Sequence, residues 1–201
     1  MTAPALVILA GGRASRLGGG DKGLLMVGGR TILDRILERL GPSVSRCAIN
    51  ANGDPARFEH FGVPVLPDPI ADRPGPLAGI LAAMGWAGAG DVVTVPGDTP
   101  FLPADLVPRL LAGRGDADVA LAASGGRVHP VVGLWPARLQ AALRKAIVEG
   151  GMRKVEAFAA QCGAVPVEFS TAPADPFFNV NRPEDLAEAE RLCRRYGDAQ
   201  N

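Results

Sequence analysis

The sequence has few of the residues that mark disulfide or zinc proteins. Its 201 residues include three cysteines, two histidines and one tyrosine, and no two cysteines form a C-x-x-C pair. An odd number of widely spaced cysteines, Cys47, Cys162 and Cys193, excludes a disulfide framework, and the distant His60 and His129 exclude a zinc motif. The sequence therefore indicates a reducing compartment and thiols without a special role.

Net charge and long apolar runs are also absent. The 21 basic residues balance 21 acidic ones, so no overall field attracts nucleic acid or an anionic membrane. The first apolar run, in MTAPALVILAGG, follows no basic leader, and no later run approaches the roughly 20 residues of a membrane span. We expect a cytoplasmic protein that binds neither nucleic acid nor membranes, with any phosphate binding confined to a local site.

Alternating strand and helix patterns predict an α/β fold. Residues 5–10 form an apolar run that ends in two glycines, which is typical of a buried parallel strand. Apolar residues at helical spacing predict a helix from Thr31 to Leu40, which Thr31 caps and Gly41-Pro42 end. Further strands are predicted over residues 44–49, 63–66, 92–95, 119–122 and 128–134, and helices over 54–61, 77–86, 136–149 and 183–195, with another beginning at Pro103.

These elements predict one domain over residues 1–201. We expect a Rossmann-like fold with a mainly parallel sheet, antiparallel additions in the second half and helices on both faces. Loops rich in Gly, Pro, Asn and Asp follow the strands, and ligands bind at that carboxyl edge of such a sheet. A nucleotide-binding half is expected over about residues 1–105 and an acceptor-binding half over about 106–195, with a frayed tail after Tyr196.

The loop L9-A-G-G-R-A-S-R-L-G-G-G-D-K22 follows the first strand directly. It combines five glycines with Arg13, Arg16 and Lys22. Glycines let backbone N–H groups approach phosphate oxygens closely, and basic side chains neutralise the remaining charge. The loop therefore predicts a triphosphate site. A basic surface turn is the alternative, but it would not require so many glycines, each of which costs conformational entropy.

Two other phosphate-binding patterns fit this loop poorly. The run from Gly18 to Gly23 matches G-x-G-x-x-G, but it begins well after the strand ends, and the first clear helix opens only at Thr31. Lys22 lacks the preceding Gly and the following Ser or Thr of a Walker A loop. A dinucleotide-binding domain is therefore only a distant alternative.

The pattern L-A-G-G-x-x-x-R-[ML]-G-x-x-D-K resembles the signature of molybdenum cofactor guanylyltransferases, with Leu17 in place of the commoner Met. The family's other blocks follow in order: Asn50-Ala51-Asn52, Asp68, Gly75-Pro76-Leu77-Ala78-Gly79, Pro96-Gly97-Asp98-Thr99-Pro100-Phe101-Leu102-Pro103, His129-Pro130 and Phe178-Asn179-Val180-Asn181 with Pro183-Glu184-Asp185-Leu186. They span nearly the whole chain.

The resemblance implies an enzyme that uses Mg²⁺ and transfers GMP from GTP to molybdenum-molybdopterin, releasing pyrophosphate. It also leaves room for transient contact with cofactor-synthesis or apo-enzyme proteins. Single blocks occur across a wider nucleotidyltransferase superfamily, so transfer from CTP to molybdopterin, or to a sugar-phosphate acceptor, stays open.

Asp98 is the first candidate for catalysis. It follows an apolar strand directly, where a carboxylate can hold a magnesium ion against the triphosphate. The alternative is an Asp that caps the turn into the Pro103 helix. The resemblance also assigns Asp98 to magnesium and nucleotide. Lys22 would neutralise the β- or γ-phosphate and favour pyrophosphate as leaving group, with Arg16 as a helper.

Base recognition is predicted at two strand ends. Asn50 and Asp68 resemble family positions that contact the guanosine moiety, and a carboxylate at Asp68 can accept from guanine N1–H and the exocyclic amine together. Either residue could instead be a strand-end turn former. Gly11 stands where related cytidylyltransferases have Ala, which leaves more room for a purine. The predicted nucleotide site comprises Leu9, Ala10, Gly11, Gly12, Lys22, Asn50, Asp68, Gly79 and Asp98.

The predicted acceptor site lies in the second half, where the family binds molybdopterin. Basic groups there would hold the pterin's terminal phosphate, and amides would supply donors and acceptors to a polar heterocycle. A buried His, a solvated helix start and turn-forming Asn residues are the structural alternatives. The candidates are His129, Arg153, Lys154, Asn179 and Asn181, and the neighbouring Arg182 stands where the family usually has Thr.

Overall fold

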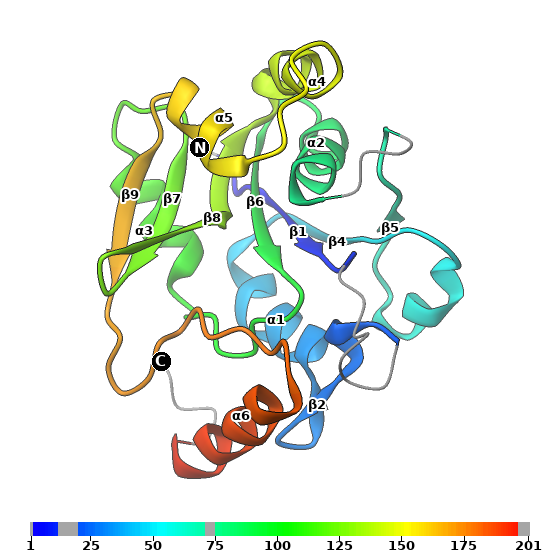
Figure 1. The fold of residues 1–201 in the computed structure, drawn as a ribbon, viewed down its shortest axis with the longest axis vertical. Helices are drawn as coiled ribbons and strands as arrows, with labels where there is room; N and C mark the ends of the chain where they lie inside the picture. The colour runs from blue at the N-terminus through cyan, green and yellow to red at the C-terminus, as the bar shows by residue number, and fades with distance from the viewer. Residues whose placement is uncertain (1, 12–19, 71–74, 197–201) are drawn as a thin grey trace.

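A seven-stranded sheet forms the centre of the molecule (Figure 1). The computed structural model describes residues 2–11, 20–70 and 75–196. The strands lie in the order β5-β4-β1-β6-β8-β7-β9. In chain order they are β1 Ala5–Leu9, β4 Arg46–Asn50, β5 Val65–Leu66, β6 Asp91–Pro96, β7 Ala120–Ser124, β8 Arg127–Pro136 and β9 Val165–Phe169.

The sheet is mainly parallel. Strands β5, β4, β1 and β6 run parallel to one another, and β9 runs parallel to β7. Strand β8 is antiparallel to both β6 and β7, with Thr94 of β6 opposite Gly133. The beginning of β8 therefore lies at the same edge as the carboxyl ends of the parallel strands. The predicted Rossmann-like sheet with antiparallel additions is confirmed.

Helices pack on both faces of the sheet, as Figure 1 shows. Leu6 and Ile8 of β1 point into one core cluster, which helices α1, α3 and α6 cover. Ala5 and Val7 point into the other, which helices α2, α4 and α5 cover. This alternation is the period of two that a strand buried on both faces requires. The helices are α1 Ile32–Leu40, α2 Pro76–Ala87, α3 Leu106–Arg114, α4 Gln140–Val148, α5 Val155–Gln161 and α6 Pro183–Tyr196.

Helix α1 begins where its sequence predicts. The Thr31 side chain accepts a hydrogen bond from Asp34 N at 3.0 Å, and the Asp34 side chain accepts one from Thr31 N. This reciprocal capping satisfies two backbone donors that the helix itself leaves free. The short hairpin before it, of β2 (Met26–Val27) and β3 (Arg30–Thr31), was not predicted.

Several predicted boundaries are wrong. Pro136 does not begin a helix, because it is the last residue of β8 and pairs with Asp91, and a 3-10 turn (η4, Ala137–Leu139) precedes α4. The helix expected from Pro103 begins at Leu106. By contrast, the short helix expected over residues 54–61 is confirmed, as the 3-10 helix η3 (Pro55–Phe61).

The second half also contains two elements that were not predicted, α5 and β9. The tail expected to fray lies outside the described residues beyond position 196. Among the helices of the described segments, none has the length and apolar character needed to cross a membrane.

Candidate functional site

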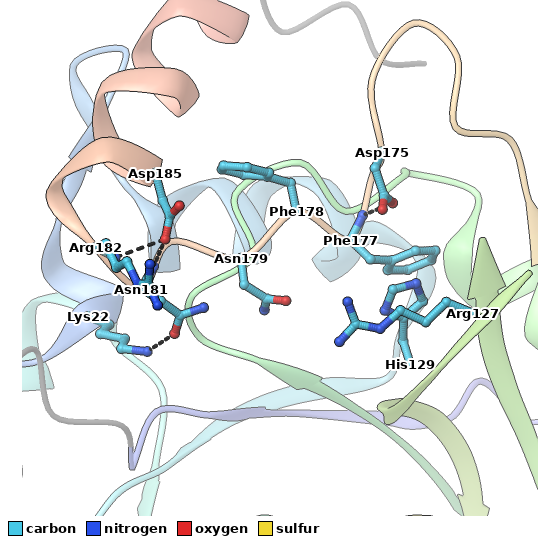
Figure 2. Close-up of a pocket in the computed structure, with 10 residues that line it drawn as sticks. All are labelled: Lys22, Arg127, His129, Asp175, Phe177, Phe178, Asn179, Asn181, Arg182 and Asp185. Carbon is cyan, nitrogen blue, oxygen red and sulfur yellow. Dashed lines mark hydrogen bonds between the residues drawn. The ribbon is translucent and has the colours of Figure 1, made fainter. Parts of the chain in front are cut away.

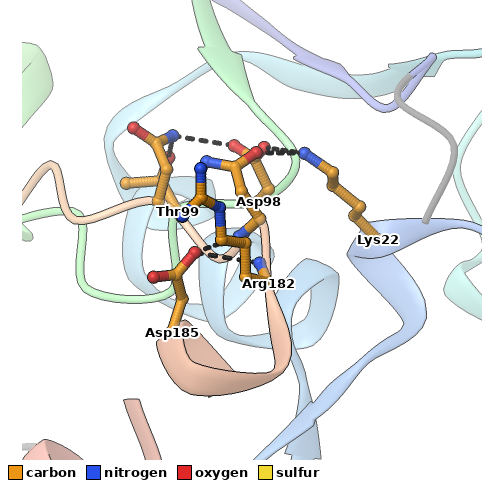
Figure 3. A network of polar contacts seen from close by, with 7 residues as sticks. Lys22, Asp98, Thr99, Arg182 and Asp185 are labelled. Carbon is orange, nitrogen blue, oxygen red and sulfur yellow. Dashed lines mark hydrogen bonds and ion pairs between the residues drawn. The ribbon is translucent and has the colours of Figure 1, made fainter. Parts of the chain in front are cut away.

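Polar side chains from three distant segments meet at the carboxyl end of β6 (Figure 3). Lys22 Nζ lies 3.0 Å from Asp98 Oδ2 and also contacts Asn181 Oδ1. Asn179 Nδ2 donates to Asp98 Oδ1 at 2.8 Å and to the buried Thr99 Oγ1 at 2.9 Å. The Lys22 and Asp98 side chains are only 18% and 19% exposed, so their ion pair is largely shielded from solvent.

The loop before α6 is fixed against this network by its backbone. Val180 N donates to the Asp98 carbonyl at 2.8 Å. Asp185, in the first turn of α6, accepts from Asn181 N and Arg182 N, both at 2.9 Å. The sequence associates this loop with the acceptor alone, whereas the structure also places it directly against Asp98.

The donor set at Asp98 fits a magnesium ion. The Lys22 ammonium lies between a carboxylate oxygen of Asp98 and the amide oxygen of Asn181, so two oxygens already converge on one cationic group. Magnesium prefers oxygen ligands and is often held by one or two protein groups together with substrate phosphates and water. Across the described ranges no cluster of three or more His, Cys, Asp or Glu side chains could hold a metal alone. A magnesium ion here would therefore need phosphate oxygens.

A second polar cluster follows β4 and β5. Asn50 Nδ2 donates to Asp68 Oδ1 at 3.0 Å, and Asn52 Nδ2 donates to Asp68 Oδ2 at 2.8 Å. Asp68 N in turn donates to Asn52 Oδ1 at 2.9 Å. Each carboxylate oxygen keeps a further lone pair for a ligand. The sequence prediction found Asn50 and Asp68 but did not count Asn52 among the site residues.

Gly11 and Gly79 differ in what the fold requires of them. A Cβ at Gly79 would lie 2.4 Å from Asn50 Oδ1 and 3.0 Å from Leu9 Cδ2, so packing alone demands glycine there. A Cβ at Gly11 would meet nothing within 4 Å. Leu9 and Ala10 line a small cavity at the same edge of the sheet. Gly79 therefore supports Asn50, whereas a Cβ at Gly11 would contact none of the described residues.

The glycine-rich loop is held at its C-terminal end, at Asp21. Gly12 and Arg16, both predicted site residues, lie outside the described residues. Arg57 Nε lies 2.8 Å from Asp21 Oδ2, and an Arg57 guanidinium nitrogen donates to the Asn52 carbonyl at 2.5 Å. Arg57, which sequence reasoning missed, thus connects the residue before Lys22 to the segment after β4.

Two cavities that share lining residues lie beside the network, and Figure 2 shows the larger one. The larger cavity measures about 640 Å³ and the smaller about 350 Å³. Arg127, His129, Phe177, Asn179 and Asn181 line both of them. In Figure 2, Arg127 and His129 lie at one end of the larger cavity, and Lys22 and Arg182 lie at the other.

The predicted acceptor residues divide into two groups in this arrangement. His129, Asn179 and Asn181 line the two cavities. Arg153 and Lys154 are exposed and line neither cavity. Arg127 also lines both cavities, yet the sequence prediction missed it, because a single Arg in a hairpin carries no pattern.

His129 is held by the buried Ser124, which in turn contacts the half-buried Asp175. Ser124 Oγ lies 2.8 Å from His129 Nε2 and 3.0 Å from Asp175 Oδ1. The ring of His129 packs on Phe177 with centroids 4.5 Å apart. Burial lowers the pKa of His129 below its usual value, and the nearby Arg127 acts in the same direction, although Asp175 opposes it. His129 is therefore neutral near pH 7.

An irregularity in strand pairing positions His129. Leu121 of β7 pairs with Gly133, but the next residue, Ala122, pairs with His129. Residues 130–132 thus have no counterpart on β7 and form a bulge in β8. Bulges of this kind redirect side chains and are common beside active sites.

The cysteines take no part in either cavity. Burial raises the pKa of the Cys47 and Cys162 thiols, which keeps them protonated near neutral pH. Cys193 Sγ accepts a hydrogen bond from Arg35 at 3.1 Å. That the thiols have no special role stays a prediction from the sequence.

The sheet order, with polar residues gathered at the carboxyl ends of β4 and β6, is that of the nucleotidyltransferase fold. Solved structures with this fold include molybdopterin-guanine dinucleotide biosynthesis protein A from Archaeoglobus fulgidus, with a TM-score of 0.74, 22% identity and coverage of 95% of this chain and 99% of that one. A nucleotidyl transferase from Methanothermobacter has a TM-score of 0.75, 19% identity and coverage of 97% and 99%.

The chain belongs to the family with the MobA-like NTP transferase domain, whose model matches residues 6–164. A molybdenum cofactor guanylyltransferase from Rhodopseudomonas palustris is 52% identical over 196 residues, which cover 94% of this chain and 93% of that protein. A protein of the same name from Cereibacter sphaeroides is 50% identical over 194 residues, covering 94% and 96%. The resemblance seen in the sequence is confirmed.

Proposed function

We propose that this protein transfers GMP from GTP to molybdenum-molybdopterin, releasing pyrophosphate and forming the guanine dinucleotide cofactor. The observation that carries the proposal is the network of Lys22, Asp98 and Asn181 at the carboxyl edge of the sheet. The names of the relatives at about half identity support guanylyl transfer over cytidylyl transfer.

The guanine base binds at the cluster after β4 and β5 in this proposal. The free lone pairs of Asp68 accept from guanine N1–H and the exocyclic amine, a pair of donors that cytosine lacks. Asn50 and Asn52 hold the carboxylate in place. Gly11, which the protein's own packing does not require, leaves room for the purine.

Asp98 and Asn181 would hold the Mg²⁺ ion that we expect this enzyme to use, together with phosphate oxygens of the nucleotide. When bound, the ion neutralises negative charge on the triphosphate. Lys22 is then available to pair with the β- or γ-phosphate, which stabilises the charge on departing pyrophosphate. Asn179 orients Asp98 through its hydrogen bond to Oδ1.

The acceptor's phosphate attacks the α-phosphorus in line. This phosphate carries negative charge near neutral pH, so the protein needs no general base. Its work is to position two anionic groups and to neutralise their repulsion. The residues proposed for this role are Lys22 and, beyond the described ranges, Arg16 and the loop amides around Gly12.

The acceptor binds in the two cavities beside Asp98. Asn179, Asn181 and His129 line them and offer the donors and acceptors of a polar heterocycle. Arg153 and Lys154 stay candidates for the terminal phosphate, but Arg127 lines both cavities and is the stronger one. The nucleotide is thus held mainly by residues before about position 105 and the acceptor mainly by later ones.

Turnover with competing substrates tests the proposal. Purified protein with magnesium and molybdopterin, with and without molybdate, should release pyrophosphate from GTP far faster than from CTP. A preference for CTP, or turnover with a sugar phosphate in place of the pterin, would contradict it. Tight NAD binding without GTP binding would favour the dinucleotide-binding alternative. A cytoplasmic location and transient protein contacts stay predictions from the sequence.

A further inference from the structure

The hydrogen bonds of Ser124 determine which nitrogen of His129 carries the proton. A serine hydroxyl has one proton to donate, and an ionised carboxylate can only accept. Ser124 Oγ lies within hydrogen-bond distance of both Asp175 Oδ1 and His129 Nε2. Both contacts are satisfied only if Ser124 donates to Asp175 and accepts from a proton on His129 Nε2.

This arrangement has little freedom to change. Ser124 is only 3% exposed, so its hydroxyl cannot turn toward bulk water. Asp175 Oδ1 also accepts from Phe177 N at 3.0 Å, which fixes the carboxylate relative to the backbone. Phe177 in turn packs against the His129 ring. The plane of the imidazole and its protonated nitrogen are therefore set together.

The other ring nitrogen, Nδ1, must then carry a lone pair. Within the described ranges, no hydrogen bond is made to Nδ1. Nδ1 is also not fully buried. His129 lines both cavities. Nδ1 is therefore accessible to a ligand, and it can only accept a hydrogen bond while the ring is neutral.

We propose that His129 is a specificity-determining residue, held by Ser124 and Asp175 as the Nε2–H tautomer, that accepts a hydrogen bond at Nδ1 from an N–H group of the acceptor's heterocycle. The identity of that acceptor rests on the proposed function. A pterin offers such donors on its ring and its exocyclic amine. If a heterocycle presented only acceptor atoms at this position, no proton would lie between its acceptor atom and the lone pair of Nδ1. The two acceptors would then repel each other, which disfavours binding.

Nitrogen-15 NMR of the free protein tests the tautomer without any substrate. The chain has only two histidines, so a His60→Gln variant assigns the signals of His129. The expected spectrum near pH 7.5 shows a protonated Nε2 and an unprotonated Nδ1. Ser124→Ala should let both tautomers appear. A protonated Nδ1 in the unmodified protein would overturn the proposal, whatever reaction the enzyme catalyses.

Two substitutions of similar size separate the ring nitrogens. Gln at position 129 places its amide near Nε2 and keeps a donor to Ser124, whereas Asn places an amide oxygen near Nδ1. We expect His129→Gln to raise the KM for the pterin acceptor about tenfold and His129→Asn to raise it less, with the KM for GTP unchanged in both. Equal acceptor KM values for His129→Gln and the unmodified protein would overturn the proposal.

Pterin alone provides a readout that does not depend on turnover. Its addition should shift the Nδ1 signal of His129 and leave that of His60 in place. An unshifted Nδ1 signal at saturating pterin, with binding established by calorimetry, would contradict the hydrogen bond. If the unmodified protein bound pterin in this way yet failed to transfer GMP, the proposed function would be wrong and the inference about His129 would stand.

Discussion

Lys22 Nζ lies 3.0 Å from Asp98 Oδ2, although 76 positions separate the two residues in the chain. The contact joins the end of the glycine-rich loop to the end of β6. Because both side chains are mostly shielded from solvent, loss of either one leaves the other charge without its partner. The two groups that we assign to phosphate and metal therefore hold each other in place in the free protein.

Replacement of Asp98 should abolish magnesium-dependent turnover. Asp98→Ala removes an oxygen of the proposed metal site, and we expect kcat/KM for pyrophosphate release from GTP to fall at least about 100-fold. Asp91→Ala is a matched control, because Asp91 pairs with Arg114 at 2.7 Å, is similarly shielded and lies at the opposite end of β6. Equal losses in the two variants would show that Asp98 acts only through stability.

Inosine triphosphate tests the proposed role of Asp68. This nucleotide keeps the N1–H of guanine but lacks the exocyclic amine, so the intact enzyme should use it about tenfold less efficiently than GTP. Asp68→Asn replaces one acceptor oxygen by a donor, and the difference between the two nucleotides should then largely disappear. The measurement is the ratio of steady-state kcat/KM for GTP to that for inosine triphosphate, in the unmodified protein and in the variant. An unchanged ratio in the variant would place the guanine elsewhere.

Alanine substitutions at Gly79 and Gly11 should change different properties of the protein. Gly79→Ala forces a methyl group against Asn50, and we expect the free energy of unfolding to fall by about 1–3 kcal/mol. Gly11→Ala should leave stability unchanged, since its Cβ meets nothing, yet raise the KM for GTP. Urea unfolding and GTP kinetics separate the effects. Gly90→Ala, whose Cβ also meets nothing, should change neither quantity.

The sequence predicted best those elements whose pattern is local. The apolar run of β1 and the N-cap Thr31 of α1 are each contained within a short segment, and both were found. Pro136 was misassigned because proline is common both at the first turn of a helix and at the end of a strand. Only pairing with Asp91, far away in the chain, decides between the two. Strand β9 alternates half-buried with exposed residues before its buried last residue and has a Pro inside, which is a weak signal.

The site residues that could be predicted from the sequence are those that stand at the end of a predicted strand. Asp98, Asn50 and Asp68 were found in this way, and the structure brings each to the edge of the sheet. Their partners were not predictable, because Asn181 reaches Lys22 across 159 positions of the chain. The Ser124 pair with Asp175 was missed for the same reason: neither residue belongs to a motif, and only the fold brings them together.

Arg127 should matter more to the acceptor than Arg153 does. Both side chains are exposed, but Arg127 lines both cavities and Arg153 lines neither. We expect Arg127→Ala to raise the acceptor KM at least about tenfold through loss of a charged hydrogen bond, with the KM for GTP little changed. Arg153→Ala is the matched comparison and should change the acceptor KM less. A larger rise in the acceptor KM for Arg153→Ala than for Arg127→Ala would instead indicate that Arg153 and Lys154, the pair that the sequence favours, bind the phosphate.

Stability should depend on pH through His129. Burial and Arg127 lower its pKa below the usual value of 6.5, against the opposing carboxylates of Asp175 and Glu168. Between the folded pKa and about 6.5 the unfolded chain therefore binds more protons than the folded one, so stability falls as the pH drops through this window.

The His129→Gln variant lacks this imidazole, so its free energy of unfolding should decline less between pH 7 and about pH 5.5 than that of the unmodified protein. Urea unfolding at several pH values measures the difference, and parallel curves for the two proteins would contradict the lowered pKa. Because protonation of the folded protein removes the lone pair of Nδ1, the acceptor KM of the unmodified enzyme should rise only as the pH falls further, through the lowered pKa of His129.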